Sequence, residues 1–166
     1  MNLNHLYTCC FTGHRPDKFA FALNKSSEQL NALRTSLEHE ITDAIQAGFY
    51  RFISGGGLGI DLLAAELVLG LKSAYPQIVL LLYLPCKNHY SLWSAYDKQT
   101  FWRIRDNADE VSYITQGEYS EGCMQKRNIA MVDDSSRIIA VFNGTSGGTK
   151  NTVEYAKKTF IDIRYI

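Results

Sequence analysis

Residues 50–61 read YRFISGGGLGID, and the architecture that we expect for the whole chain can be worked out from them. Residues 50–54 are predicted to form a strand, and four glycines occur within the next five residues, before a helical pattern begins at Ile60. Glycines at such a junction let the backbone approach an anion closely, and the free N–H groups of a helix start favour negative charge. The stretch therefore predicts a strand-to-helix loop that contacts a ligand; a tight turn that needs positive φ is the alternative.

Strands and helices alternate along the rest of the chain. Apolar runs predict further strands at 7–12, 77–84, 110–115, 137–143 and 161–165, and helical patterns predict helices at 27–47, 60–74, 97–107, 123–133 and 151–159. Ser27 is expected to cap the first helix, and Gly48 is expected to end it. This alternation is typical of a parallel sheet with right-handed crossovers. We predict a single Rossmann-like three-layer α/β domain over residues 1–166, with a mainly parallel, doubly wound sheet.

The charge balance limits the classes of partner. The 166 residues are 46% hydrophobic, and 17 basic residues balance 17 acidic ones. A protein that grips a nucleic-acid backbone usually carries a basic excess, so nucleic acid is not an expected partner. The first residues lack the basic start and long apolar stretch of a signal peptide, and no apolar run is long enough to span a bilayer. We therefore expect a soluble, cytoplasmic protein without a membrane partner.

Cysteine and histidine spacing gives no sign of a metal site. Cys9, Cys10, Cys86 and Cys123 form no C-x-x-C motif, and His5, His14, His39 and His89 share no ligand spacing. Adjacent cysteines of a strand point to opposite faces, so Cys9 and Cys10 are not expected to pair with each other. We predict buried, reduced thiols and no bound metal.

Three unusual segments follow predicted strands, at the edge where ligands of such sheets bind. They are TGHRP at 12–16, SGGGLGID at 54–61 and NGTSGGT at 143–149. The third repeats the glycine-rich arrangement of the second and adds hydroxyl groups that can reach phosphate oxygens. The second is not a Walker loop, because no Gly-Lys-Ser/Thr follows, and it does not match the dinucleotide-binding pattern. Two glycine-rich loops at one edge of a sheet favour a nucleotide or a similar phosphate ligand.

Side chains in and near these loops are candidates for ligand contact. His14 supplies a titratable ring and Arg15 a planar guanidinium for phosphate, unless both are solvated at the surface. Asp61 would accept a hydrogen bond from a ribose hydroxyl, or cap the start of its helix. Arg127 would reach a phosphate and Asn128 a base, or both would lie on a solvated helix face.

Aromatic residues gather within 13 positions of the chain, at Tyr90, Trp93, Tyr96, Phe101 and Trp102. Aromatic rings that follow a strand end can stack on a nucleobase. They can equally pack in the core or form the surface of a homodimer. The sequence leaves these three readings open.

Taken together, the motifs resemble those of the SLOG superfamily, and most closely its YpsA-like branch. GHRP, SGGGLGID, KRN-x-x-MVD-x-S and GGT-x-x-T carry the resemblance over nearly the whole chain. It implies a Rossmann-like nucleotide-binding fold shared with the DNA-processing protein DprA and with the cytokinin-activating LOG phosphoribohydrolases. It also implies a link to bacterial growth and cell division, without a settled biochemical activity.

The resemblance implies a set of pocket residues, carried over position by position: Gly13, Arg15, Gly55, Gly56, Gly59, Asp61, Arg127, Asn128, Gly147, Gly148 and Thr149. His14, Ser54 and Gly57 join this candidate ligand-binding set because they belong to the same loops. The LOG pattern P-G-G-x-G-T-x-x-E is matched only in part by residues 146–154. Its Pro, later Gly and Thr are missing, whereas Glu154 falls in register.

We therefore predict a protein that binds or senses a nucleotide or an ADP-ribose-like ligand, with no other cofactor. The alternative is a hydrolase of the N-glycosidic bond of nucleoside monophosphates, with Glu154 or Asp61 as the catalytic carboxylate. A third hypothesis is a DprA-like binder of single-stranded DNA through Arg103, Arg105, Lys126 and Arg127. The lack of a basic excess makes it the weakest of the three.

Overall fold

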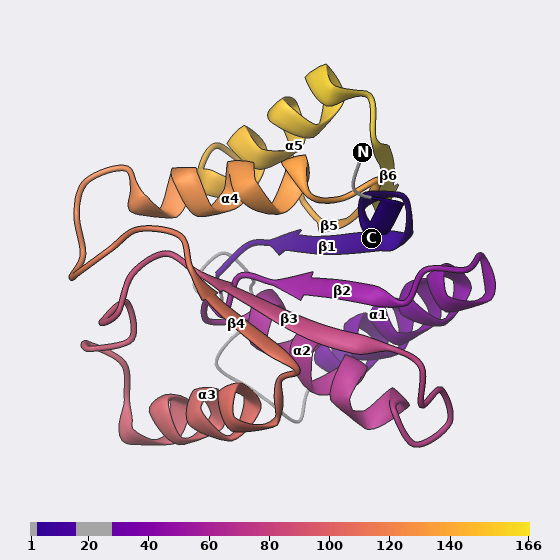
Figure 1. Ribbon diagram of the computed structural model, residues 1–166, viewed down its shortest axis with the longest axis horizontal. Helices are drawn as coiled ribbons and strands as arrows, with labels where there is room; N and C mark the ends of the chain where they lie inside the picture. Colours follow the sequence, from indigo (N-terminus) through magenta and orange to yellow (C-terminus); the bar gives the residue numbers. More distant parts are fainter. Residues whose placement is uncertain (1–2, 16–27) are drawn as a thin grey trace.

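The computed structural model describes residues 3–15 and 28–166, and a six-stranded sheet crosses this part of the chain (Figure 1). Its strands are β1 (Thr8–Gly13), β2 (Arg51–Ser54), β3 (Val79–Leu84), β4 (Glu110–Tyr113), β5 (Arg137–Val141) and β6 (Asp162–Tyr165). The spatial order is β4-β3-β2-β1-β5-β6, and every neighbouring pair is parallel. The predicted three-layer α/β class is confirmed.

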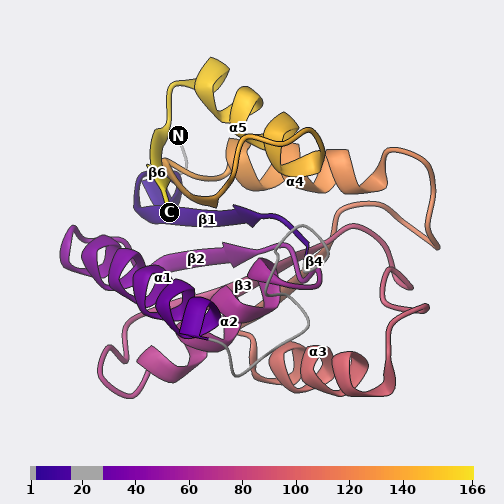
Figure 2. The same cartoon turned by 180° about the vertical axis from the view of Figure 1, so that it is seen from behind.

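Helices cover both faces of the sheet (Figures 1 and 2). One face is covered by α1 (Glu28–Gln46), α2 (Ile60–Leu71) and α3 (Ala95–Asn107), and the other by α4 (Cys123–Asp133) and α5 (Gly148–Thr159). The chain moves from β1 outward to β4, then crosses to β5 and β6 on the other side of β1. The direction of winding therefore reverses between β1 and β5, which is the position where open α/β sheets bind ligands.

The core has two layers because successive residues of a strand point to opposite faces. Cys9 packs with Leu37 and Ile41 of α1, whereas Cys10 packs with Met131 of α4. The predicted opposite orientation of the two thiols is confirmed, and all four cysteines are buried and free. In β3 every residue after Val79 is buried, as expected for an inner strand covered on both faces.

Element boundaries differ from the prediction where a cap or a glycine decides them. α3 begins two residues early because the Ser94 hydroxyl accepts a hydrogen bond from the Asp97 N–H at 3.1 Å. α5 begins at Gly148, earlier than predicted. Glycine has a low propensity for the interior of a helix, but the first turn does not need a residue that favours the interior. The 3-10 helix η1 (Leu3–Tyr7) was not predicted, since so short an element carries no periodic pattern.

Gly48 ends α1 as predicted. Its φ of 98° lies in the left-handed region, and its N–H donates to the Ile45 carbonyl oxygen at 3.0 Å. Ser27, the expected cap at the other end of α1, lies outside the described residues, as does Pro16 of the first loop. Among the helices of the described part, none is long and apolar enough to cross a membrane.

We expect Leu37→Ala to lower the free energy of unfolding by about 2–5 kcal/mol, because it leaves a cavity between α1 and the sheet. Leu37 is fully buried, whereas Leu92 is 97% exposed. The matched Leu92→Ala change should alter stability by less than about 0.5 kcal/mol. Urea unfolding of both variants measures this, and equal losses would contradict the assignment of the core.

Candidate functional site

A cleft opens at the carboxyl edge of the sheet, at the switch point between β1 and β5. It holds about 910 Å³ of empty space, open solvent at its mouth included. Its lining comes from five segments of the chain: Phe11, Thr12, Gly13, His14, Arg15, Gly57, Leu58, Asp61, His89, Trp93, Met124, Arg127, Asn128, Ser146, Gly147, Gly148 and Thr149. The structure therefore brings the three predicted loops together at one place.

Most of the predicted ligand-binding residues line this cleft. Those that do are Gly13, His14, Arg15, Gly57, Asp61, Arg127, Asn128, Gly147, Gly148 and Thr149, whereas Ser54, Gly55, Gly56 and Gly59 are not part of the lining. Glu154 is not part of it either: its side chain is exposed on α5 and forms an ion pair with Lys157 at 2.9 Å. Of the two candidate catalytic carboxylates, only Asp61 faces the cleft.

Arg127 connects the second loop to α4. Its Nη1 donates a hydrogen bond to the Gly55 carbonyl oxygen and lies 3.6 Å from Asp61 Oδ2. Its Nε donates to Asn128 Oδ1 at 2.7 Å. Asp61 Oδ2 also accepts the Gly57 N–H at 3.0 Å. Through these contacts Arg127 joins α4, on one face of the sheet, to the start of α2 on the other face.

The Arg127–Asp61 pair is withdrawn from water. The side chains are 9% and 14% exposed. Burial raises the pKa of the Asp61 carboxyl, and the guanidinium and the Gly57 N–H oppose this rise. Burial likewise lowers the pKa of Arg127, against the attraction of Asp61. Each charge is therefore tolerated in this position because the other is present.

Two glycines of the predicted set are required by packing. A Cβ at Gly55 would overlap the Arg127 guanidinium, and a Cβ at Gly13 would lie 2.5 Å from the Cβ of Ile60. At Gly56 the backbone has a φ of 64°, which side chains rarely tolerate. Close contacts and backbone conformation within the protein thus account for these glycines, and the approach of a ligand to them stays a prediction.

The Ser54 hydroxyl stabilises the glycine-rich loop that follows β2 through two hydrogen bonds. This hydroxyl donates to the Asp61 carbonyl oxygen at 2.7 Å and accepts the Gly56 N–H at 3.2 Å. The residue is fully buried. Its role in the structure is to fix the path of the glycine-rich backbone around the turn into α2.

Two histidines border the cleft. The Nε2 atom of His14 accepts the Asn143 N–H at 3.2 Å, which joins the loop after β1 to the loop after β5. The Nε2 atom of His89 lies 3.0 Å from the Gly56 carbonyl oxygen, and burial lowers the pKa of this ring. His89 was not predicted, because it lies in an irregular segment and belongs to no motif.

The aromatic residues between positions 90 and 102 differ in their surroundings. Phe101 is fully buried in the core, whereas Trp93 lines the cleft and meets the ring of His89 edge-on at 5.2 Å. Tyr96 and Trp102 are 61% and 41% exposed. The predicted homodimer surface at these exposed rings stays a prediction.

The start of α5 presents backbone donors to the cleft. Gly147 is the N-cap residue, with a φ of 143°, and its carbonyl oxygen accepts the Asn151 N–H at 3.1 Å. The N–H groups of the first helical turn have no partners within a helix. Two residues of that turn, Gly148 and Thr149, line the cleft, so the positive end of the helix lies beside it.

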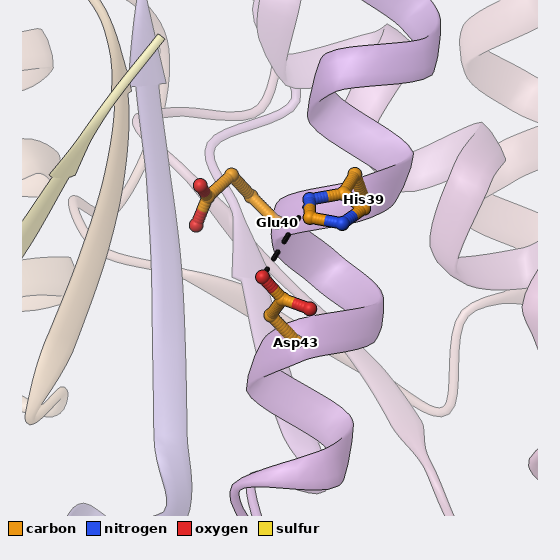
Figure 3. Close-up of side chains that lie close together, drawn as sticks. All are labelled: His39, Glu40 and Asp43. Carbon is orange, nitrogen blue, oxygen red and sulfur yellow. Dashed lines mark ion pairs between the residues drawn. The ribbon is translucent and has the colours of Figure 1, made fainter.

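A group of metal-ligand type lies elsewhere, on α1. Figure 3 shows His39 and Glu40 projecting from one turn of this helix and Asp43 from the next, with His39 Nδ1 3.5 Å from Asp43 Oδ2. One ligand atom from each lies within 4.8 Å of the others. A comparison of histidines alone could not find this group, because its second and third members are carboxylates. None of the three lines the cleft, and the expectation of no bound metal stays a prediction.

The parallel, doubly wound sheet and the glycine-rich loops at its switch point define a Rossmann-like α/β protein. The chain belongs to the YpsA family: the family profile, described as the YspA SLOG family, matches residues 9–165. The sequence resemblance is thereby confirmed.

Two relatives come from species of Bacillus. The chain is 39% identical over 123 residues to the uncharacterized SPbeta prophage-derived protein YoqJ of Bacillus subtilis, an alignment that covers 68% of this chain and 72% of YoqJ. It is 27% identical over 150 residues to a UPF0398 protein of Bacillus cereus, covering 89% and 80% of the two chains.

Solved structures of DprA share the fold. DprA from Helicobacter pylori, described for its single-stranded DNA binding mode, matches 98% of this chain with a TM-score of 0.64 and 16% identity. DprA from Streptococcus pneumoniae matches 99% of it with a TM-score of 0.65 and 16% identity. The chain spans only 66% and 51% of these two proteins. At this identity the likeness concerns the fold alone.

Arg127→Gln should lower the free energy of unfolding by roughly 3–5 kcal/mol near pH 7, because Asp61 is left buried without its cation. The folded-state pKa of Asp61, already raised by burial, then rises further. The folded state then binds the proton more tightly than the unfolded chain, so stability increases as the pH falls through that pKa. Urea unfolding at several pH values should show a smaller loss in acid than at neutrality.

Arg103→Gln is the matched control. Arg103 pairs with Glu66, but its side chain is 58% exposed. Exposed pairs contribute at most about 1 kcal/mol, so little change is expected. Suppose that Arg127→Gln lowers the free energy of unfolding no more than this control does, or by an amount that does not depend on pH. The buried Arg127–Asp61 pair would then not be a stabilising ion pair.

Proposed function

We propose that the cleft binds a phosphate-bearing nucleotide or a nucleotide-like molecule of the ADP-ribose type. The observation that carries the proposal is the convergence of both glycine-rich loops and of the segment after β1 on one cleft at the switch point. Ligands of open α/β sheets bind at this position. The lining of the cleft includes cationic side chains, backbone donors of a helix start and apolar side chains.

The phosphate would lie between Arg15 and the start of α5. Arg15 is exposed at the cleft, and its guanidinium makes no hydrogen bond or ion pair with the described residues. Gly148 and Thr149 bring the free donors of a helix start to the same cleft. Arg127, by contrast, already contacts Gly55, Asp61 and Asn128, so it holds the loop while Arg15 meets the ligand.

The sugar would contact Asp61, and the base would contact the apolar residues of the lining. Both contacts of Asp61 use Oδ2, so Oδ1 can accept a hydrogen bond from a ribose hydroxyl. Trp93, Met124 and Leu58 give the cleft an apolar wall against which a base can pack. In this arrangement the phosphate lies near the Arg15 guanidinium, and the base packs against the Trp93 ring.

Binding without turnover fits the positions of the carboxylates better than hydrolysis. Glu154, the residue in register with the LOG glutamate, lies exposed on α5 and pairs with Lys157. Asp61 is engaged by Arg127 and the Gly57 N–H. Asp61 is the one carboxylate among the described residues that line the cleft, and it is already engaged, so we favour a protein that binds or senses its ligand.

Small-molecule binding also fits the cations better than DNA binding. Arg103 and Arg105 are paired with Glu66 and Asp106, and Arg127 is buried. Of the four cations considered for DNA, this leaves Lys126 alone exposed and without an ion pair within residues 3–15 and 28–166. Such an arrangement provides no continuous basic groove of the kind that follows a nucleic-acid backbone.

We expect at least one of AMP, ADP, ATP, ADP-ribose and NAD to raise the melting temperature saturably. Arg15→Gln should weaken that binding by roughly tenfold or more, the effect of losing a hydrogen bond to a charged group. Arg105→Gln, a change outside the cleft, should leave it unchanged. Thermal-shift titration followed by calorimetry measures the dissociation constants.

Chromatography of each bound nucleotide decides between binding and turnover. An intact ligand supports the sensor, whereas release of free base that Asp61→Asn abolishes would establish the hydrolase instead. Binding that persists unchanged in Arg15→Gln, or no binding by any of the five compounds, would overturn the proposal. Retention of oligonucleotides that depends on salt would favour the DNA-binding alternative.

A further inference from the structure

A second cleft lies at the other end of α4. It is lined by the last residues of α4, by η1 and by side chains of β1, β2 and β3: Leu3, Asn4, His5, Leu6, Thr8, Arg51, Ile53, Tyr83, Asp133 and Asp134. It holds about 900 Å³ of empty space, open solvent included, and shares no residue with the first cleft. Figure 1 shows α4 running along the sheet from the carboxyl edge of the strands toward their amino edge.

Arg51 is a half-buried cation that lines this cleft. Its Nε is buried, and no atom of residues 3–15 and 28–166 accepts a hydrogen bond from it. No salt bridge of Arg51 occurs in that part of the chain either. A charged donor that is buried without an acceptor costs free energy, so such a group calls for an explanation. A bound anion that accepts from the guanidinium would provide one.

Two carboxylates, those of Asp133 and Asp134, line the same cleft. Tyr155 donates its hydroxyl to Asp133 Oδ1, and Tyr83 donates its hydroxyl to Asp134 Oδ2, both at 2.7 Å. These bonds fix the carboxylates and leave the second oxygen of each to accept from a ligand. Both residues also lie at the C-terminal end of α4, where the helix dipole favours a cation.

The third side of the cleft is apolar and is held in place. Leu3 and Leu6 of η1 are 65% and 53% exposed, and Ile53 lies in the sheet beside them. η1 is tied to the sheet because the Asn4 carbonyl oxygen accepts from the Thr8 hydroxyl at 2.7 Å and the Leu6 carbonyl oxygen accepts from the Ser136 hydroxyl at 2.9 Å. The exposed leucines therefore form a fixed wall that an apolar ligand group can cover.

We propose that this second cleft binds a free α-amino acid with an apolar side chain. Its carboxylate accepts hydrogen bonds from Arg51, its ammonium donates to Asp133 and Asp134, and its side chain packs against Leu3 and Leu6. A ligand with only negative charge, such as phosphate, meets two carboxylates, and one with only positive charge leaves Arg51 unpaired. A zwitterion satisfies both groups, and the inference is independent of the nucleotide proposed for the first cleft.

Calorimetric titration of the full chain with each standard apolar amino acid tests the proposal. At least one, with L-leucine as the reference probe, should bind saturably. Leucinamide lacks the carboxylate and 4-methylpentanoate lacks the ammonium, so each should bind about tenfold more weakly or worse. The proposal fails if no apolar amino acid binds, or if either analogue binds as tightly as its parent.

Substitutions locate the site. Arg51→Gln and Asp134→Asn should each weaken binding by about tenfold or more, since each removes one charge-assisted contact. Arg164→Gln, a change on β6 outside the cleft, should leave it unchanged. Binding that survives Arg51→Gln in a variant with an unaltered circular dichroism spectrum would overturn the proposal. If that variant does not fold, Arg51→Lys and the analogue series on the unaltered protein still decide the question.

Discussion

One buried guanidinium holds the working edge of the sheet together. Arg127 reaches from α4, on one face of the sheet, to the carbonyl oxygen of Gly55 and the carboxylate of Asp61, at the start of α2 on the other face. The contact is possible because position 55 has no side chain: a Cβ there would occupy the space of the guanidinium. The path of the glycine-rich loop, and with it one wall of the cleft, depends on this contact. The hydrogen bonds of the Ser54 hydroxyl with Gly56 and Asp61, and of the Gly57 N–H with the Asp61 carboxylate, belong to the same network.

Periodicity and glycine spacing predicted the architecture because a parallel sheet leaves few choices. An apolar run without alternation, such as residues 77–84, must be covered on both faces. Loops that follow parallel strands must then meet at one edge, which is why three segments distant in sequence could be assigned to one cleft. Charged side chains were harder to assign. Nothing local indicates that Arg127 pairs with a residue far back in the chain, or that His89 reaches the Gly56 carbonyl oxygen.

Register with a motif does not show where a side chain lies in the fold. Glu154 matches the glutamate of the LOG pattern in sequence, and the structure places it on α5, exposed and paired with Lys157, outside the lining of the first cleft. The second cleft lay beyond sequence reasoning for another reason. It needs η1, which is too short to leave a pattern, to lie against Arg51 and the end of α4. Contacts between segments without a motif become visible only once the chain is folded.

The strands at the two ends of the sheet have a consequence for how the protein behaves in a crowded solution. β4 and β6 have four residues each and carry exposed charge, with Glu110 on one and Asp162 and Arg164 on the other. Short, charged strands at a sheet margin resist the addition of a further strand from another molecule. The fold thus carries its own protection against edge-to-edge aggregation and amyloid-like growth at both margins, even though its inner strands are among the most apolar segments of the chain.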